Sequence, residues 1–373
     1  MTDIEILTTE DEVEKLAHSL RHESSVAVDL EMDAMHNYRE KICLAQISTT
    51  QHTVLADPLV GGNLAPLAGV FAETGIRKIF HAVDYDLRSL KRDYGFAVHN
   101  LFDTMIAAQF CGEEKIGLAD LLGKYFGVKL DKKYQRADWS HRPLKKEMIA
   151  YAAEDTRHLH RLVAILEEKL RELGRLDWLH EECKLLEEIC FDENSGPLFL
   201  RFKGAGKLER RQLAQLEELL QWRDKEAERR NCPHFKVVGN KSLLALILTR
   251  PEGVDALSSL EGMSSRQVER YGQQLLNCLD KANQIDEEDL PLFPRAPRIK
   301  RDPQVDQLLA KLKVWRTKKA ADLAIDPGVL VNNSLLEAVA RQRPKRPEDL
   351  HQVRGLRSWQ IGEIGEDIVA IVR

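Results

Sequence analysis

The sequence lacks the long apolar run that a membrane-spanning helix needs, because no stretch of about 18 consecutive apolar residues occurs among its 373 residues. Residues 1–5 are partly acidic and contain no apolar segment, so no secretory signal is expected. The six cysteines are scattered and form no CxxC pair, which argues against a zinc site and against a disulfide framework. Free thiols in a reducing cytoplasm are the simplest interpretation.

The composition is that of a globular protein, with 43% hydrophobic and 31% charged residues, and the length suits two or three domains. The net charge of −5 is unevenly distributed. Residues 1–195 contain 24 Lys and Arg against 35 Asp and Glu, whereas residues 196–373 contain 31 against 25. The basic half could contact phosphate, although an excess of this size is also compatible with an ordinary solvated surface.

The first part of the chain alternates strand and helix patterns, which predicts an α/β domain with a mixed sheet over residues 1–195. Short connections between the first three strands predict an antiparallel meander. A long final helix is expected to begin near Pro143 and to end at Gly174. The other expected elements are strands 25–31, 42–48, 53–57, 78–80 and 100–102, and helices 64–73 and 84–94.

From about residue 208 onward the pattern is helical and repeats at a constant offset of about 93 residues, counted along the sequence. Trp222 matches Trp315, and Pro251 matches Pro344. Two copies of one small all-α domain are therefore expected, over residues 208–283 and 303–373. An acidic and proline-rich stretch between them predicts a stiff, polar linker. Both tryptophans follow leucines at helical spacing, which favours core packing over base stacking.

Two carboxylates lie on one face of the first strand. Asp29 and Glu31 are two residues apart in an apolar segment, and side chains alternate between faces along a strand. Carboxylates in such a segment need compensation of their charge, and a hard divalent cation with oxygen ligands would supply it. The alternative is a polar edge strand with a solvated face.

Two further acidic positions follow along the chain. Asp84 and Asp86 lie where a strand runs into a helix, with Asp84 as the expected N-cap, and such junctions often line ligand sites. Tyr151 and Asp155 are four residues apart and share one helix face. Taken singly, these residues could serve only a helix terminus and a solvated helix surface. Taken together, four carboxylates could hold two divalent ions for phosphodiester displacement.

The order of these motifs resembles the DEDD superfamily of 3′→5′ exonucleases, in the subgroup with a tyrosine in the third motif. Asp29-Leu30-Glu31 matches the first motif, Asp86 the aspartate of the second, and Tyr151 to Asp155 the third. Within the superfamily the chain is most similar to the bacterial ribonuclease D family, and its repeat resembles that family's paired helicase-and-RNase-D C-terminal (HRDC) domains. The resemblance covers nearly the whole chain and implies a ribonuclease H-like exonuclease domain followed by two HRDC-like domains.

The resemblance also implies the roles of the site residues. Asp29 would bridge two divalent metal ions, Mg²⁺ or Mn²⁺, and Glu31 and Asp155 would complete the site that generates the nucleophile. Asp86 would hold the second metal, and Tyr151 would orient the attacking water. Because a free tyrosine has a pKa near about 10, orientation suits Tyr151 better than general-base catalysis.

The implied activity is hydrolysis from RNA 3′ ends, transfer RNA precursors above all, releasing nucleoside 5′-monophosphates. A DNA exonuclease and a catalytically silent RNA-binding protein on the same fold remain alternatives, as do a monomer and a dimer. No obligate protein partner is indicated, and a cytoplasmic location is expected. The chain departs from the family at Met32-Asp33, where ribonuclease D often has phenylalanine, and this pair is a place where substrate preference could be set.

Other residues near the motifs have simpler explanations. His81 is expected to be a packed or capping histidine rather than a metal ligand, because Mg²⁺ prefers oxygen. Asp103 is expected to cap the helix that follows it. Arg136 and the neighbouring lysines Lys132 and Lys133 could touch the RNA backbone or form a solvated basic loop.

Overall fold

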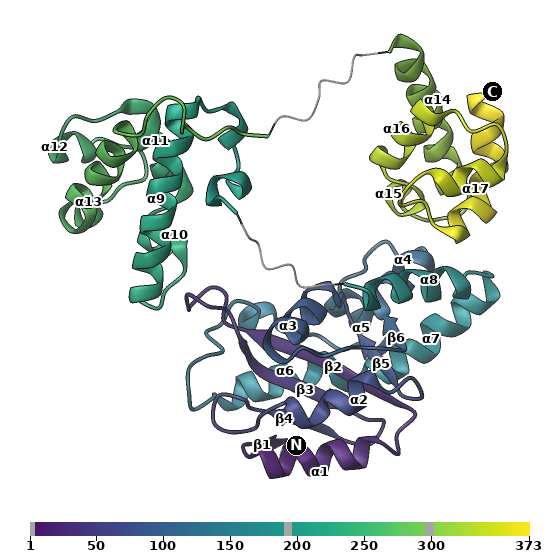
Figure 1. Cartoon of the computed structure of the whole chain (residues 1–373). Coiled ribbons are helices and arrows are strands. Elements are labelled where there is room, and N and C mark those ends of the chain that lie inside the picture. Colours follow the sequence, from purple (N-terminus) through teal and green to yellow (C-terminus); the bar gives the residue numbers. More distant parts are fainter. Residues whose placement is uncertain (1–3, 190–195, 295–301) are drawn as a thin grey trace. The chain divides into compact units, whose positions relative to one another are not determined.

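A computed structural model describes residues 4–189, 196–294 and 302–373 (Figure 1). Its described residues form two compact units. Unit 1 contains residues 4–32, 42–189 and 302–373, and unit 2 contains residues 33–41 and 196–294. Within the described ranges, every helix is too short or too polar to cross a lipid bilayer.

Unit 1 is built on a mixed six-stranded sheet with the order β1-β4-β3-β2-β5-β6. Strands β2, β3 and β4 pair antiparallel, as the expected meander requires, whereas β5 and β6 run parallel to β2. The first strand, β1, was not expected from the sequence and pairs parallel with β4 at one edge. The strands are β1 (Glu5–Leu7), β2 (Ser25–Met32), β3 (Ile42–Ser48), β4 (Thr53–Ala56), β5 (Arg77–Phe80) and β6 (Leu101–Asp103).

Strand β2 lies inside the sheet, and both of its faces are covered along its first half. Val26 and Val28 point to one face and Ala27 to the other, and all three are buried. Pairing with β5 ends at Ala27, opposite Ile79, while pairing with β3 continues to the end of β2. The second half of β2, which carries Asp29 and Glu31, therefore extends beyond β5.

The helices that precede residue 190 lie around this sheet (Figure 1). The spacing of Thr9 and Glu12 forms a capping box that begins α1. The expected long final helix is instead two helices, because the chain breaks at His158, and the first begins three residues after Pro143. The elements are α1 (Glu10–Leu20), η1 (Ala65–Leu67), α2 (Ala68–Ala72), α3 (Asp84–Tyr94), α4 (Thr104–Phe110), α5 (Leu118–Phe126), η2 (Lys132–Tyr134), α6 (Lys146–Arg157), α7 (Leu159–Glu172) and α8 (Leu176–Glu187).

The helical repeat appears as two copies whose corresponding elements begin 93 residues apart. In unit 2, Trp222 packs edge-on against Tyr271 at 5.3 Å between ring centroids, and in unit 1 Trp315 packs against the apolar core. The first copy comprises α9 (Arg210–Arg229), α10 (His234–Val237), α11 (Asn240–Thr249), α12 (Val254–Leu257) and α13 (Ser265–Asn283), preceded by η3 (Leu198–Arg201) and η4 (Ala205–Lys207). The second comprises α14 (Pro303–Asp322), α15 (Pro327–Leu330), α16 (Asn333–Gln342), η5 (Pro347–Gln352) and α17 (Ser358–Val372).

The stretch expected to link the two copies is only partly described. Leu290 is buried in a small cluster with Ala214 and Ala282, so the described start of the stretch packs against the first copy. Pro303 is the first residue of α14, where its fixed φ suits a helix start. Residues 295–301, which include Pro297, lie outside the described residues.

Within unit 1, the second helical copy packs directly on α8. The rings of Trp178 and Trp359 stack with centroids 4.5 Å apart. The Glu181 carboxylate accepts the backbone N–H groups of Ser358 and Trp359 at 2.7 and 2.9 Å. An acidic side chain from α8 thus caps the first turn of α17, whose own N-cap residue is Arg357.

Candidate active site

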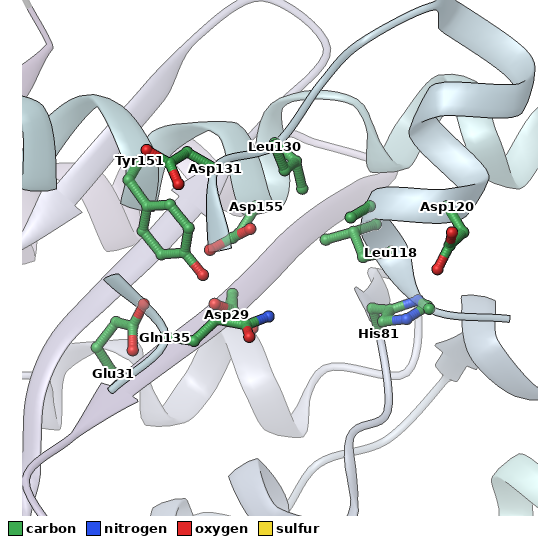
Figure 2. A pocket seen from close by; sticks show the side chains of 12 residues that line it. Asp29, Glu31, His81, Leu118, Asp120, Leu130, Asp131, Gln135, Tyr151 and Asp155 are labelled. Atoms are coloured by element: carbon green, nitrogen blue, oxygen red, sulfur yellow. The ribbon is translucent and has the colours of Figure 1, made fainter. Parts of the chain in front are cut away.

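The structure brings three of the four expected carboxylates into one cluster. Asp29 and Glu31 come from the end of β2, and Asp155 comes from α6. Each offers a carboxylate oxygen, and these oxygens all lie within 4.8 Å of one another. Figure 2 shows the three side chains converging, with Tyr151 beside them. Asp86 lies outside this cluster, but Asp29 is close enough to raise the pKa of its carboxyl group.

Helix α6 reaches the cluster because its inner face is small. Ala152 and Ala153 are fully buried where α6 packs against β2, β3 and β4. The hydroxyl groups of Thr156 and Ser48 lie 2.7 Å apart and join the helix to β3. This close approach places Tyr151 and Asp155, one turn apart, over the end of β2.

Asp86 is buried in the first turn of α3, as its motif predicted, but the capping differs from expectation. The N-cap residue is Val83, which offers no side-chain hydrogen bond. Asp84 is instead the first helical residue and pairs with Arg88 at 2.9 Å. The missing acceptor is supplied by Asp103 at the end of β6, whose carboxylate accepts the Ala82 and Val83 N–H groups at 3.1 and 2.9 Å.

The carboxylates repel one another and have lost much of their water. Burial, above all, raises the pKa of Asp29 to about 7 and that of Asp155 to about 8. Burial and the charges of Asp29, Asp155 and Asp86 raise the pKa of Glu31 to about 10. Burial and the charge of Asp29 hold the pKa of Asp86 well above its usual range.

Tyr151 faces Asp155 and remains protonated. Burial and the neighbouring carboxylates raise the pKa of its hydroxyl group, which also hydrogen-bonds Asp155. Its ring lies against Trp139, at 6.1 Å between centroids, and Tyr134, at 5.8 Å. A protonated tyrosine packed between these rings can donate a hydrogen bond and so orient a bound molecule, but it cannot serve as a base at neutral pH.

The support behind Tyr151 comes from an ion pair between the buried Asp57 and the partly buried Arg142. The Arg142 guanidinium binds the Asp57 carboxylate through two contacts of 2.5 and 2.7 Å. It also donates to the carbonyl oxygens of Trp139 and Cys43, both at 2.7 Å. Arg142 thereby ties the loop that carries Trp139 to β3. Asp57 directly follows β4 and belongs to no motif, so the sequence offered only its position as a signal.

The carboxylates open into a pocket of about 470 Å³ (Figure 2). Besides the cluster and Tyr151, residues that belong to no expected site form its walls. The lining includes His81, Leu118, Asp120, Leu130, Asp131 and Gln135. Lys133, in η2, and Arg136 are exposed close to Gln135 in the sequence, so this basic segment borders the pocket.

The pair that follows the first motif has a structural explanation. Asp33 is fully buried, and its carboxylate accepts hydrogen bonds from Asn37 Nδ2 at 2.7 Å and from the Lys41 backbone N–H at 2.9 Å. Met32 packs partly buried against the apolar core. Asp33 is therefore a loop-forming residue whose side chain is committed to its own segment.

The cluster has the properties of a divalent-metal site. Three carboxylates within one cation's reach are the donor set that hard cations prefer. The upward pKa shifts of Asp29 and Asp155 show that this environment disfavours their negative charge in the absence of a cation. A bound divalent ion would relieve both the repulsion and the lost hydration, so the residues fit such an ion.

Family models match the chain in three segments. A 3′-5′ exonuclease family matches residues 4–171, and the HRDC domain family matches residues 212–279 and 305–372. The exonuclease match contains all of the residues Asp29, Glu31, Asp86, Tyr151 and Asp155. Enzymes of this exonuclease family use divalent metal ions, in agreement with the donor set of the cluster.

The chain is also similar to individual proteins. Ribonuclease D of Gluconacetobacter diazotrophicus is 30% identical over 372 residues, covering 98% of this chain and 92% of the relative. The catalytic core of RRP6 from Trypanosoma brucei is 30% identical, with a TM-score of 0.66, and the match covers 75% of this chain and 80% of that one. Escherichia coli RNase D, described as an exoribonuclease involved in structured RNA processing, shares the fold with a TM-score of 0.75 at 24% identity, covering 100% and 99% of the two chains.

Proposed function

Because the chain belongs to the ribonuclease D family of 3′→5′ exoribonucleases, we propose that Asp29, Glu31, Asp86 and Asp155 hold two divalent metal ions at its active site. The observation that carries this proposal is the convergence of Asp29, Glu31 and Asp155 oxygens within 4.8 Å. Asp86 is the ligand proposed for the second ion, since it is buried near Asp29 and comes from a different element, the first turn of α3. Mg²⁺ and Mn²⁺ both suit this oxygen donor set.

The proposed role of each site residue follows from the position of its side chain. Divalent ions bound here would stabilise charge on the attacking and leaving oxygens of a phosphodiester. Asp29 and Asp155 face each other from β2 and α6 and would fix the position of the scissile phosphate through those ions. Tyr151, held protonated beside Asp155, would orient the attacking water. Hydrolysis would release nucleoside 5′-monophosphates one at a time.

RNA 3′ ends are the proposed substrate, with transfer RNA precursors as the natural class. The relation to E. coli RNase D supports a structured RNA substrate. The exposed Lys133 and Arg136 beside the pocket are the proposed contacts for the RNA backbone, because cations there would meet the phosphates of the entering strand. The basic balance of residues 196–373 supports a further electrostatic contribution.

The proposal also includes the domain boundaries that the sequence predicts. We place the exonuclease domain at residues 1–195 and the two HRDC-like domains at residues 208–283 and 303–373. The scattered cysteines of the sequence, which form no CxxC pair, support a reducing cytoplasm as the proposed location. The proposal requires no obligate protein partner.

A substitution of Asp29 tests the metal assignment. Asp29→Asn should abolish cleavage of a short RNA while RNA binding persists, because it removes a metal ligand and leaves the basic surface. Asp177→Asn, on an exposed carboxylate of α8, is the matched control and should retain full activity. Residual activity of Asp29→Asn within about tenfold of the wild type would contradict the two-metal assignment.

A second experiment separates RNA from DNA. Matched RNA and DNA oligonucleotides are digested side by side, and the released mononucleotides are identified. Faster decay of RNA, with 5′-monophosphate products, is expected. Equal or faster decay of DNA would favour the DNA exonuclease instead, and binding without decay of either would favour the silent RNA-binding protein.

A further inference from the structure

His81 occupies a wall of the active-site pocket away from the tyrosine. It directly follows the last residue of β5, and Figure 2 shows it with Asp120 on the opposite side of the view from Glu31 and Tyr151. Its Nδ1 atom lies 2.9 Å from Oγ1 of Thr104, a fully buried residue at the start of α4. His81 is thus oriented by a second element rather than by its own loop alone.

The Thr104 hydroxyl group determines which ring nitrogen of His81 carries the proton. Its single proton is donated to the Phe80 carbonyl oxygen at 2.9 Å. Oγ1 of Thr104 must therefore accept the hydrogen bond from His81, so Nδ1 is the protonated nitrogen. Nε2 is left with its lone pair, and within the described ranges it has no hydrogen-bond partner.

The lone pair of Nε2 restricts what His81 can bind. Burial lowers the pKa of His81, an effect that outweighs the charge of Asp103, so the ring is neutral at neutral pH. A neutral acceptor cannot donate to a phosphate oxygen. His81 also lies outside the group of metal-ligating atoms formed by Asp29, Glu31 and Asp155, and Mg²⁺ prefers oxygen. The ligand must therefore supply a hydrogen-bond donor.

We infer that Nε2 of His81 accepts a hydrogen bond from a ribose 2′-hydroxyl group at the RNA 3′ end, making His81 a determinant of sugar specificity. An enzyme that removes successive nucleotides needs contacts that every nucleotide can make. Base amino groups differ between nucleotides, whereas the ribose hydroxyl groups are common to all of them and absent in part from DNA. This inference rests on the exoribonuclease activity and adds a substrate contact to it.

The test compares oligonucleotides that differ by one oxygen atom. The variant His81→Phe keeps a planar ring but lacks the hydrogen-bond acceptor. We assay it beside the wild type on four substrates. These are all-RNA and RNA with a terminal 2′-deoxy, a terminal 3′-deoxy or a penultimate 2′-deoxy sugar. His81→Phe should cut all-RNA about tenfold more slowly, the cost of one lost hydrogen bond, yet match the wild type on the one substrate that lacks the partner hydroxyl. That substrate identifies the hydroxyl group. Equal loss on all four substrates, or a match with the wild type on the 3′-deoxy substrate alone, would overturn the inference.

Two controls keep this result separate from folding and from the general activity. His160→Phe alters a comparably half-buried histidine outside the pocket, whose Nε2 lies 3.4 Å from the Ser25 carbonyl oxygen, and should leave the substrate ratios unchanged. Thr104→Val removes the acceptor that keeps the proton of His81 on Nδ1, so it should reduce sugar discrimination. Thr104→Ser retains this hydroxyl group and should preserve the discrimination. If His81→Phe does not fold, the Thr104 pair decides alone, and equal discrimination in both variants overturns the inference. Failure of the wild type to digest RNA would instead overturn the exoribonuclease assignment.

Discussion

The Asp103 carboxylate, at the end of β6, accepts the backbone N–H of Ala82, just after the neighbouring strand β5, at 3.1 Å, and so holds the turn that precedes Asp86. Ala82 has a φ of 62°, a left-handed conformation that costs a non-glycine residue about 1–2 kcal/mol. The same carboxylate accepts the N–H groups of Met105 and Ile106 and caps α4. One buried residue therefore serves two helix starts, and only its role at α4 was expected from the sequence.

Asp103→Ser separates these two duties. Serine is as good an N-cap as aspartate for α4, but its side chain is too short to reach Ala82 and Val83. We expect a loss of about 2–3 kcal/mol in the free energy of unfolding and a several-fold rise in the metal concentration needed for half-maximal activity. Asp302→Ser, at the N-cap of α14, is the control and should change neither quantity appreciably. An unaltered metal requirement in Asp103→Ser would limit Asp103 to a role in stability.

Tyr151→Phe tests orientation against general-base catalysis. Phenylalanine retains the packing against Trp139 and Tyr134 and removes only the hydroxyl group. We expect kcat to fall by about 10- to 100-fold with the shape of the pH profile unchanged, because a hydroxyl group with a raised pKa does not titrate in the working range. Loss of the alkaline or acidic limb of the profile in this variant would instead identify Tyr151 as a titrating base. Tyr134→Phe, which keeps the ring beside Tyr151, provides the control.

The raised carboxyl pKa values predict an unusual dependence of stability on pH and metal. In the metal-free protein, Asp29 and Asp155 have pKa values of about 7 and about 8. Because these lie above the unfolded values, their contribution to stability is fully present below about pH 4 and is lost as the pH rises toward 8. A divalent cation binds the ionised carboxylates, so Mg²⁺ should raise Tm more at about pH 8 than at about pH 5.5.

Calorimetry of the full chain with EDTA and with excess Mg²⁺ measures this difference at both pH values. Asp29→Asn removes one of the repelling charges and one ligand, so its metal-free Tm at about pH 8 should equal or exceed that of the wild type. Its gain with Mg²⁺ should be small. A larger Mg²⁺ effect at acidic pH in the wild type would contradict the assignment of the cluster as the metal site.

Trp359→Ala tests the packing of the second helical copy on α8. Removing the indole should cost about 3–5 kcal/mol, because it leaves a cavity against Trp178 and Phe110 in the same core. Hydrogen exchange should accelerate in α8 as well as in α17, since both helices share this contact. Trp222→Ala, a half-buried tryptophan of unit 2, should leave exchange in α8 unchanged. Acceleration confined to α17 would mean that the two regions unfold independently.

The sequence by itself determined the features with a local period. Alternation identified β2 and placed Asp29 and Glu31 on one face, while helical spacing placed Tyr151 and Asp155 on another. The 93-residue offset fixed two equivalent helical domains. Strand β1 was not predicted because three residues are too few for alternation to be distinctive. The helix break at His158 was not predicted because neither glycine nor proline marks it.

The tertiary structure alone decided which distant residues support the site. Asp103 reaches Ala82 across 21 residues of sequence, Asp57 reaches Arg142 across 85, and Glu181 reaches Ser358 across 177. No periodic pattern connects such positions, because periodicity reports only which residues of one element share a face. The sequence therefore determined which side chains we propose to carry the chemistry, and the packing of separate elements decided the bonds that hold them in place.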